Sequence, residues 1–383
     1  MDSQYPEAIK ELIKVLQESA IRRTDNVISI NESWKCAAQM DGGGSLAKSR
    51  MLNRTFAVSA GKMGKRNWDK FVIKYDFSYK RDKLIREIKW IRSLPDNLAR
   101  FFPEIIHYSI DEKMPFYITP YYEKYSTMNS LFLDKQLPKS YINKAIGELL
   151  TLMFEHIYPK NKSYKCKDYF KNHYIERFKR REKETTKLCK SFKELFEADK
   201  LIINGIIYDN APVIVSKIEN NKKLMKRLNP KFLNTIHGDL HLGNILFSND
   251  HSPKFKLIDP AAFETGDYIY DLGKLYHTFN GMYDMFYFNK FKLDMWKRKK
   301  QIHAKLRIKR NKNYDYLKDN FKRIIESKNF KIISDDPDWE LKALVAEAFH
   351  YITMMPFHLR NEEKAKAIYL QGVVLLNEAY SRT

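Results

Sequence analysis

The most constraining feature of this chain is a set of polar residues with fixed spacing just past its middle. Residues 237–246 read His-Gly-Asp-Leu-His-Leu-Gly-Asn-Ile-Leu, and residues 257–260 read Leu-Ile-Asp-Pro. A tight loop that carries Asp239 and Asn244, followed by a hairpin that returns to Asp259, can aim all three side chains at one point. The sequence therefore predicts a loop and a hairpin that hold two carboxylates and an amide together.

This spacing suits the transfer of a phosphoryl group. Such a transfer needs little covalent chemistry from the protein and a great deal of positioning. One carboxylate, here Asp239, orients the acceptor hydroxyl, while Asn244 and Asp259 supply oxygen ligands that hold Mg²⁺ against a triphosphate. The motif therefore predicts a kinase-type site that uses ATP and Mg²⁺.

At these residues the sequence resembles the aminoglycoside-phosphotransferase and choline-kinase branch of the protein-kinase-like fold. That branch carries H-G-D-x-H-x-x-N where protein kinases carry H-R-D-x-K-x-x-N, and an Ile-Asp-Pro type motif where they carry D-F-G. The resemblance implies that Asp239 is catalytic and that His241 contacts the γ-phosphate or the acceptor. It also implies that His237 hydrogen-bonds backbone near Asp259.

The resemblance further implies an α+β, bilobal protein-kinase-like fold. Residues 1–120 would form a small antiparallel β-sheet lobe with one helix, and residues 121–383 a larger, mainly helical lobe with the catalytic loop 237–246 and the acceptor-binding helices. Such a fold needs a strand lysine paired with a helix glutamate to hold the α- and β-phosphates. Lys74 lies in the β-branched and aromatic run Phe71–Tyr75, and Glu87 follows in a segment whose apolar residues recur at helical spacing. We expect these two residues to pair.

A phosphate-cradling turn should precede the lysine strand. The glycine cluster Gly42, Gly43 and Gly44, followed by Ser45, occupies that part of the chain, although it does not satisfy G-x-G-x-x-G. Adjacent glycines let backbone N–H groups approach phosphates, but a plain hairpin turn explains the run almost as well.

The adenine is expected on the segment that joins the two lobes. Residues 115–119 have the composition of a strand, and Pro120, Tyr121 and Tyr122 follow it. Backbone groups of these three residues would contact the adenine edge, with apolar neighbours on either side of the ring. Two adjacent tyrosines are more often packing residues than ligand contacts.

A second acidic pair follows the hairpin in the segment Gly266–Leu272, which resembles the family pattern G-D-x-x-x-D-L-A with Gly273 in place of the alanine. Asp271 is the candidate for a helix carboxylate that holds the catalytic loop through its backbone donors, and Asp267 is expected to start the helix. The patterns at 270–284 and 353–358 look like those of bacterial phosphotransferases associated with sugar and surface-polysaccharide metabolism.

Composition adds few constraints on the setting of the protein. No run of eighteen apolar residues is present, the first residues lack the regions of a secretory signal, and residues 8–16 fit an amphipathic helix. The three cysteines suggest neither a disulfide framework nor a zinc site. These observations favour a cytoplasmic protein, and the sequence does not indicate an oligomeric state.

The formal net charge is +22, and much of it lies in two stretches. Lys160–Lys193 is rich in basic and aromatic residues, and Lys290–Lys312 carries eleven basic residues against the single acid Asp294. The resemblance implies that both stretches form acceptor-binding helices, one before the catalytic loop and one after it. They could attract an anionic acceptor, bind a membrane surface or nucleic acid, or be solvated faces, and the sequence leaves these readings open.

The expected reaction is transfer of the γ-phosphoryl group of ATP to a hydroxyl of a small molecule, such as a sugar or a cell-surface polysaccharide precursor. A protein kinase or an AMP-transferring enzyme would use a similar constellation. The non-enzymatic alternative is a basic pseudokinase that binds nucleic acid or anionic membrane. The sequence does not identify the acceptor.

Overall fold

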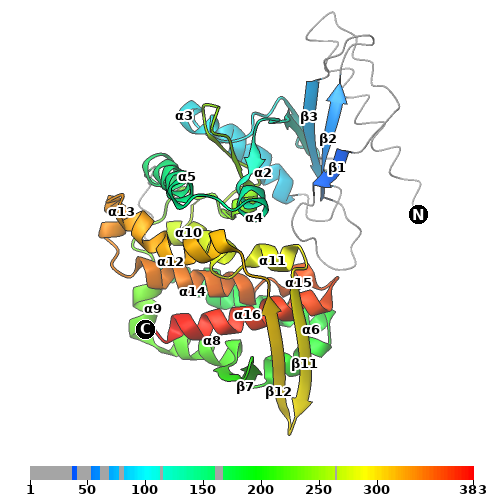
Figure 1. Cartoon of the computed structure of the whole chain (residues 1–383), viewed down its shortest axis with the longest axis vertical. Helices are drawn as coiled ribbons and strands as arrows, with labels where there is room; N and C mark the ends of the chain where they lie inside the picture. The colour runs from blue at the N-terminus through cyan, green and yellow to red at the C-terminus, as the bar shows by residue number, and fades with distance from the viewer. Residues whose placement is uncertain are drawn as a thin grey trace, which may run out of the picture. The chain divides into compact units, whose positions relative to one another are not determined.

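The computed structural model describes residues 37–40, 53–60, 69–76, 82–112, 115–159, 167–263 and 265–383 (Figure 1). The described chain forms two compact units. The first contains strands β1–β5 and most of helix α2, and it ends at Glu123. The second contains residues 93–102 and the chain from Lys124 to Thr383. The predicted α+β composition is confirmed, with a small antiparallel sheet in one unit and a mainly helical second unit.

The first unit is built on a five-stranded antiparallel sheet with the strand order β1-β2-β3-β5-β4. The run predicted as a strand at Phe71–Tyr75 lies within β3, the central strand, where Lys74 pairs with Tyr117 of β5. Leu84 and Ile88 on one face of α2 pack against Tyr117, which fixes the helix beside the sheet. The bounds in this unit are β1 Ala37–Met40, β2 Asn53–Ala60, β3 Asp69–Asp76, α2 Asp82–Ser93, β4 His107–Ser109 and β5 Phe116–Pro120.

The second unit is organised around three helices, α10 (Tyr268–Phe279), α14 (Trp339–Ile352) and α16 (Glu362–Tyr380), which pack in that order and lie together in Figure 1. A Cβ atom at Gly273 of α10 would lie 2.8 Å from Ala346 Cβ and 3.0 Å from the backbone nitrogen of Glu347 on α14. The two helices therefore approach so closely at Gly273 that a side chain there would force α10 and α14 apart.

The remaining helices surround these three. Their bounds are α3 Asp96–Ala99, α4 Met128–Asp134, α5 Lys139–Leu152, α6 Glu176–Leu188, α7 Ser191–Glu197, α8 Ala211–Asn220, α9 Lys222–Leu228, α11 Tyr283–Tyr287, α12 Lys312–Glu326, α13 Lys331–Ser334 and α15 Met355–His358. Short π-helical turns at Met153–Ile157 and Lys171–Ile175 extend α5 and precede α6. In the described part of the chain, no helix is both long and apolar enough to cross a membrane.

The predicted hairpin before Asp259 is present. Strands β9 (Ile245–Phe247) and β10 (Phe255–Leu257) pair in antiparallel fashion, and β6 (Ser126–Thr127) adds to β9. A single 3₁₀ turn, Leu242–Asn244, connects the loop to β9.

The expectation of helices in both basic stretches is correct for only one of them. In the first stretch, Tyr169, Phe170, Tyr174 and Phe178 are buried in helical segments, as their spacing suggested. The second stretch instead forms two long strands, β11 (Phe291–Arg298) and β12 (Gln301–Ile308). They join β7 (Lys200–Ile203) and β8 (Ile206–Asp209) in the sheet order β11-β12-β7-β8. The physical reason is a period of two in the apolar residues: Phe291, Leu293 and Met295 alternate with polar residues, and so do Ile302, Ala304 and Leu306.

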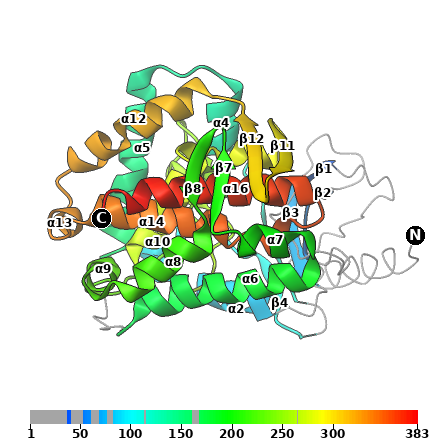
Figure 2. The ribbon, with the colours of Figure 1, turned by 90° about the horizontal axis from the view of Figure 1, so that it is seen from below.

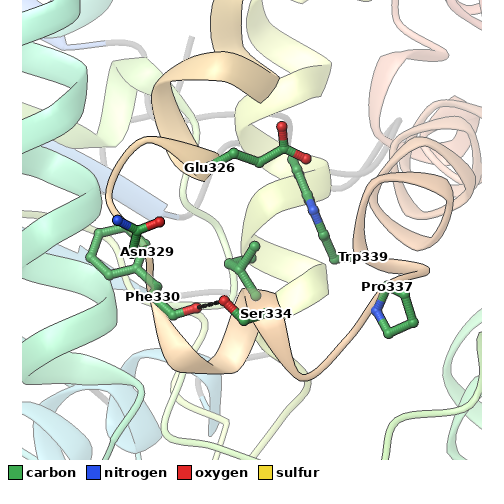
Figure 3. A pocket seen from close by; sticks show the side chains of 7 residues that line it. Glu326, Asn329, Phe330, Ser334, Pro337 and Trp339 are labelled. Atoms are coloured by element: carbon green, nitrogen blue, oxygen red, sulfur yellow. Dashed lines mark hydrogen bonds between the residues drawn. The ribbon is translucent and has the colours of Figure 1, made fainter.

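A small surface hollow of about 220 Å³ lies where α12, α13 and α14 meet (Figure 3). Its walls are Glu326, Asn329, Phe330, Ile333, Ser334, Pro337 and Trp339. None of these belongs to the predicted site, and the Ser334 hydroxyl is already bonded to the carbonyl oxygen of Phe330. The hollow is therefore a gap in the packing between these helices.

Candidate active site

The carboxylate of Asp271 holds the start of the loop 237–246 through hydrogen bonds to its backbone. Asp271 lies in the first turn of α10 and is fully buried. Its Oδ2 accepts a hydrogen bond from the backbone N–H of His237 at 2.8 Å, and its Oδ1 accepts one from Gly238 N–H at 2.7 Å. Burial raises the pKa of Asp271 to about 7, while these N–H groups oppose that shift. The arrangement is the one expected of Asp271, since two backbone donors of the loop converge on a single side chain.

Gly238 makes this contact possible. Its φ is +79°, in the left-handed region, and a Cβ there would lie 2.7 Å from both Ala261 Cβ and Phe263 Cδ2. A side chain at position 238 would therefore be strained and would also collide with the chain that follows Asp259.

His237 ties the loop to the second half of the motif. Its Nδ1 accepts a hydrogen bond from the backbone N–H of Asp239 at 3.2 Å, and its Nε2 lies 2.9 Å from the carbonyl oxygen of Ile258. Because Nδ1 is an acceptor, the proton resides on Nε2 and is donated to Ile258. Burial lowers the pKa of His237 to about 4, so the ring is neutral at physiological pH. The contact to backbone beside Asp259 is the one expected for this histidine.

Asn244 completes the connection between the loop and the hairpin. Its Nδ2 donates to the carbonyl oxygen of Asp239 at 3.0 Å and to Asp239 Oδ2 at 3.3 Å. The backbone carbonyl oxygen of Asn244 accepts a hydrogen bond from the N–H of Ile258 at 2.9 Å. Asp259, next in the chain, is half-buried and has a φ of +56°. The backbone therefore brings Asp239, Asn244 and Asp259 to one place.

The donor chemistry at this place fits Mg²⁺. The Nδ2 of Asn244 is engaged with Asp239, whereas among the described residues its Oδ1 accepts no hydrogen bond and remains available as an oxygen ligand. Asp259 offers the carboxylate oxygens that Mg²⁺ prefers. Within the described ranges there is no cluster of three or more histidine, cysteine or acidic side chains suited to a metal. A site of one amide and one carboxylate would rely on phosphate and water for its other ligands.

The His241 ring lies close to the carboxylate of Asp239. Its Nδ1 accepts from the N–H of Gly243 at 3.1 Å, which fixes the ring, and its Nε2 lies 4.0 Å from Asp239 Oδ2. The His241 side chain is partly exposed, so the edge of the ring can meet a ligand beside Asp239.

Two cations near Asp239 were missed in the sequence. Lys274 Nζ lies 2.9 Å from Asp239 Oδ1, and its side chain is only 12% exposed. Arg177 on α6 donates to the hydroxyl of Tyr270 at 2.6 Å, and Tyr270 is the main cause of its raised pKa, with a smaller contribution from the charge of Asp239. Lys274 could have been found, because it lies three residues after Asp271 on the same helix and therefore on the face that meets the loop. No local signal indicates Arg177, which lies far away in the sequence.

Asp267 occupies the N-cap position of α10. Its side chain accepts from the N–H of Ile269 at 3.1 Å, and its own N–H donates to the hydroxyl of Tyr169. The residue is buried, and burial raises its pKa to about 7. Asp267 thus fixes the start of the helix that carries Asp271 and Lys274.

In the first unit, Lys74 and Glu87 form a buried ion pair. Lys74 Nζ lies 2.7 Å and 2.8 Å from the two carboxylate oxygens of Glu87, and the Tyr117 hydroxyl donates to Oε1 at 2.9 Å. Lys74 is 6% exposed and Glu87 is 1% exposed. Burying two charges is costly, so a pair like this is weak evidence for stability and better evidence for a functional role.

The other predicted nucleotide contacts are only partly described. Gly42, Gly43, Gly44 and Ser45 lie outside the described residues. Pro120 ends β5, where it pairs with Phe71. Tyr121 is 39% exposed, whereas Tyr122 is partly buried and its hydroxyl accepts a hydrogen bond from the N–H of Glu104 at 3.0 Å. The side chain of Tyr122 therefore packs within the first unit, and contact between its backbone and adenine stays a prediction.

A model of the phosphotransferase enzyme family (APH) matches residues 175–294. This segment is less than half of the chain, but it contains the loop 237–246, Asp259 and the start of α10. A search of curated proteins finds no match.

Similar solved structures include kinases of small molecules. A protein assigned as a fructosamine-3-kinase from Haemophilus somnus 129PT is 12% identical, with 88% of this chain and 91% of that chain covered and a TM-score of 0.45. The ADP-bound aminoglycoside phosphotransferase APH(2'')-Ib is 13% identical, with 85% and 95% covered and a TM-score of 0.47. An aminoglycoside-3'-phosphotransferase of type VIII is 13% identical, with 71% and 83% covered and a TM-score of 0.37. By the family match, the part of this chain that carries the loop 237–246 is similar to the phosphotransferase enzyme family.

Proposed function

We propose that this protein is an ATP-dependent phosphotransferase that moves the γ-phosphoryl group to a hydroxyl of a small molecule. One observation carries the proposal. The hydrogen bonds from Asn244 to Asp239 and from the N–H of Ile258 to the backbone carbonyl of Asn244 join the loop held by Asp271 to the backbone before Asp259, and this arrangement supports the roles proposed for Asp239, Asn244 and Asp259. The family match over the same segment supports it.

Asp239 is the proposed catalytic residue. Its carboxylate accepts the hydrogen bond of the acceptor hydroxyl and takes the proton as the oxygen bonds to the γ-phosphorus. The bond between that phosphorus and the oxygen bridging to the β-phosphate breaks, and ADP leaves with the electron pair. Lys274 and Asn244 hold the carboxylate at 2.9 Å and 3.3 Å, so it need not reorient during the reaction. His241 would contact the γ-phosphate or the acceptor.

Asn244 and Asp259 are the proposed ligands of Mg²⁺. The ion, when bound, would neutralise the β- and γ-phosphates. His237, Asp267 and Asp271 act through the backbone, since they position the loop and the helix below it.

Further contacts with ATP are proposed for the first unit. Lys74, oriented by Glu87, would bind the α- and β-phosphates. The glycine cluster Gly42–Gly44 with Ser45 would cover them, and the backbone of Pro120–Tyr122 would contact the adenine.

For the acceptor we propose a sugar or a precursor of a cell-surface polysaccharide, on the pattern at 270–284. Lys274, whose Nζ lies 2.9 Å from Asp239 Oδ1, supports a neutral or anionic acceptor over a polycation. A cytoplasmic location is proposed because ATP is the donor.

The test is ADP release from Mg·ATP by purified protein against a panel of sugars, sugar phosphates, amino alcohols, aminoglycosides and nucleosides. Asp239→Asn should lower kcat by about 10²–10⁴-fold on any active acceptor. The matched control is Asp250→Asn, an exposed aspartate in the turn between β9 and β10, which should be unchanged. Near-normal activity of Asp239→Asn would show that the assignment is wrong.

The mass of the product separates the competing reactions. A gain of one phosphate supports the proposed transfer, whereas a gain of AMP would indicate the reverse orientation of the nucleotide. Transfer to a protein and to none of the small molecules would indicate a protein kinase.

A further inference from the structure

The sheet β11-β12-β7-β8 has one covered and one open face. On the covered face the side chains of β7 and β12 are buried: Leu201, Ile203, Ile302, Ala304 and Leu306. The Nδ2 of Asn377 on α16 donates to the carbonyl oxygen of Asp209, which attaches the end of β8 to that helix. The alternate residues of each strand point to the opposite face. Figure 2 shows the four strands side by side, and Figure 1 shows the hairpin β11–β12 extending beyond the helices of its unit.

An apolar row crosses the open face. The strand register places Trp296 opposite His303, His303 beside Ile202, and Ile202 opposite Ile207. Trp296 is 48% exposed and Ile207 is 62% exposed, at the two ends of the row. The rings of Trp296 and His303 stack with centroids 5.4 Å apart. Four consecutive apolar or aromatic side chains across an exposed sheet face form a patch, unlike single scattered hydrophobic residues.

Cations surround this row on the same face. Lys292 and Arg307 form one cross-strand pair, and Lys305 faces Asp294 in the next. The members of this basic set are Lys200, Lys292, Arg298, Lys305 and Arg307, and all are exposed.

Most of these charges are not neutralised. Arg307 pairs with Asp294 at 2.8 Å. Among the residues that the structure describes, the other four cations, Lys200, Lys292, Arg298 and Lys305, form no ion pair. The face therefore carries a net positive charge around an apolar centre.

The hairpin tip adds two charges at a conformational cost. Lys299 and Lys300 form the two-residue turn between β11 and β12, with φ of +47° and +64°. The turn between β7 and β8 has the same signs at Asn204 and Gly205, with φ of +53° and +85°. Asn-Gly is the sequence that such a turn favours, whereas lysines rarely adopt positive φ. The sequence thus places two cations at the tip where uncharged residues would fit with less strain.

We propose that this open face, with the β11–β12 tip, binds an anionic lipid bilayer. An exposed tryptophan suits the boundary between lipid headgroups and hydrocarbon, and lysine and arginine keep their charges among the headgroups while their stems follow the apolar surface. The aliphatic Ile207 and Ile202 can enter the acyl boundary but cannot stack on nucleobases, and one face of the Trp296 ring is already covered by His303. These features favour a bilayer over a single-stranded nucleic acid, which needs open aromatic surfaces.

The proposal of bilayer binding does not depend on the proposed phosphotransfer, because none of the residues on this sheet face belongs to the candidate active site. The test is co-sedimentation of the full chain with vesicles of phosphatidylcholine alone and with vesicles that contain phosphatidylglycerol in equal amount. We expect binding to the anionic vesicles only, decreasing as salt is added.

Variants locate the binding. Each basic residue near an anionic surface contributes roughly a factor of five, so the double variant Lys292→Gln/Lys305→Gln should bind about 25-fold more weakly. Ile207→Ser and Trp296→Ala should each weaken binding by roughly tenfold, because less apolar surface enters the bilayer. The matched control is Lys222→Gln/Lys223→Gln on α9, which removes two exposed lysines away from the sheet and should lose less than half of the binding. Circular dichroism and thermal unfolding check that each variant is folded.

Four results would overturn the proposal. The first is an absence of binding to anionic vesicles, and the second is equal binding to neutral vesicles. The third is binding of single-stranded RNA, lost in the sheet variants, by a protein that does not bind vesicles. If the α9 control weakens vesicle binding as much as the sheet variants do, the charge of the whole protein and not this face is responsible, and the proposal is equally refuted.

Discussion

The substitution Asp271→Asn tests the contact that holds the loop 237–246, which carries the proposed catalytic residue Asp239. Asparagine has nearly the shape of aspartate, but it keeps one acceptor oxygen and replaces the other with an NH₂ donor. One of the two N–H groups now bonded at 2.7 Å and 2.8 Å would then face a donor. A hydrogen bond to a charged group contributes about 1.5–3 kcal/mol, and a buried donor without a partner costs about 1–3 kcal/mol.

We therefore expect the loop to lose about 3 kcal/mol of positioning free energy, which corresponds to about 150-fold in kcat if Asp239 is displaced to the same extent. The KM for ATP should change much less, since the phosphate contacts proposed for Lys74 are unaffected. The neutral amide also avoids the cost of burying a charge, so the free energy of unfolding should fall by less than the loss in kcat implies. The assay is steady-state ADP release together with urea unfolding.

A control on the same helix makes the result specific. Asp267→Asn changes another buried aspartate of α10, but asparagine is as good an N-cap as aspartate, so kcat should stay within about twofold. If Asp271→Asn keeps normal kcat while Asp239→Asn is inactive, the loop does not depend on Asp271 and the reasoning is refuted. The same conclusion follows if both α10 variants lose activity equally, because helix stability would then explain the loss.

Three further results follow from the same region. Because burial raises the pKa of Asp271 from 3.8 to about 7, the folded state retains a proton that the unfolded state has released. The contribution of this carboxyl to the free energy of unfolding therefore falls as the pH rises from 3.8 to about 7. The free energies of unfolding measured in urea at about pH 5 and about pH 8 should differ less in Asp271→Asn than in the unchanged protein. Lys274→Met removes the ion pair with Asp239 and should lower kcat by about tenfold with little change in thermal stability, whereas equal kcat would exclude a positioning role. Gly273→Ala should destabilise the fold by about 1–2 kcal/mol because the backbone of α14 cannot move aside, while Gly147→Ala, which meets only the flexible end of a lysine, should be neutral or stabilising in thermal unfolding.

The parts of the site that the sequence predicted are those set by local spacing. Lys74 and Glu87 are thirteen residues apart in the sequence. The end of strand β3, a short connection and the first turns of helix α2 are enough to bring the two side chains together. The loop and hairpin of the main motif are likewise contiguous in the chain, so Asn244 reaches both Asp239 and the residue before Asp259. These contacts require only regular secondary structure and few assumptions about tertiary packing.

The contacts that were missed depend on packing between distant segments. Arg177 approaches the site from α6, and its bond to Tyr270 spans 93 residues. Helix was expected for the β11–β12 segment because the resembled fold has acceptor-binding helices in this part of the chain, although the apolar residues of the segment alternate. Its turn also lacks the Asn-Gly signal that would have indicated a hairpin, while the β7–β8 turn, Asn204-Gly205, carries it.

The Lys299-Lys300 turn allows one variant to test whether these lysines serve the fold of the hairpin or the proposed binding of anionic lipid. If Lys299 and Lys300 serve only to close the hairpin, replacing them with Asn-Gly should be purely beneficial, because a non-glycine residue at positive φ costs about 1 kcal/mol. If they serve the open sheet face, the same variant should gain about 1–2 kcal/mol in the free energy of unfolding and yet bind anionic vesicles about 25-fold more weakly, since two charges are lost. Urea unfolding and vesicle co-sedimentation of this one variant measure both effects. A gain in stability with unchanged vesicle binding would show that the tip takes no part in binding, and a loss of stability would show that the lysines support the fold in a way that the turn geometry does not explain.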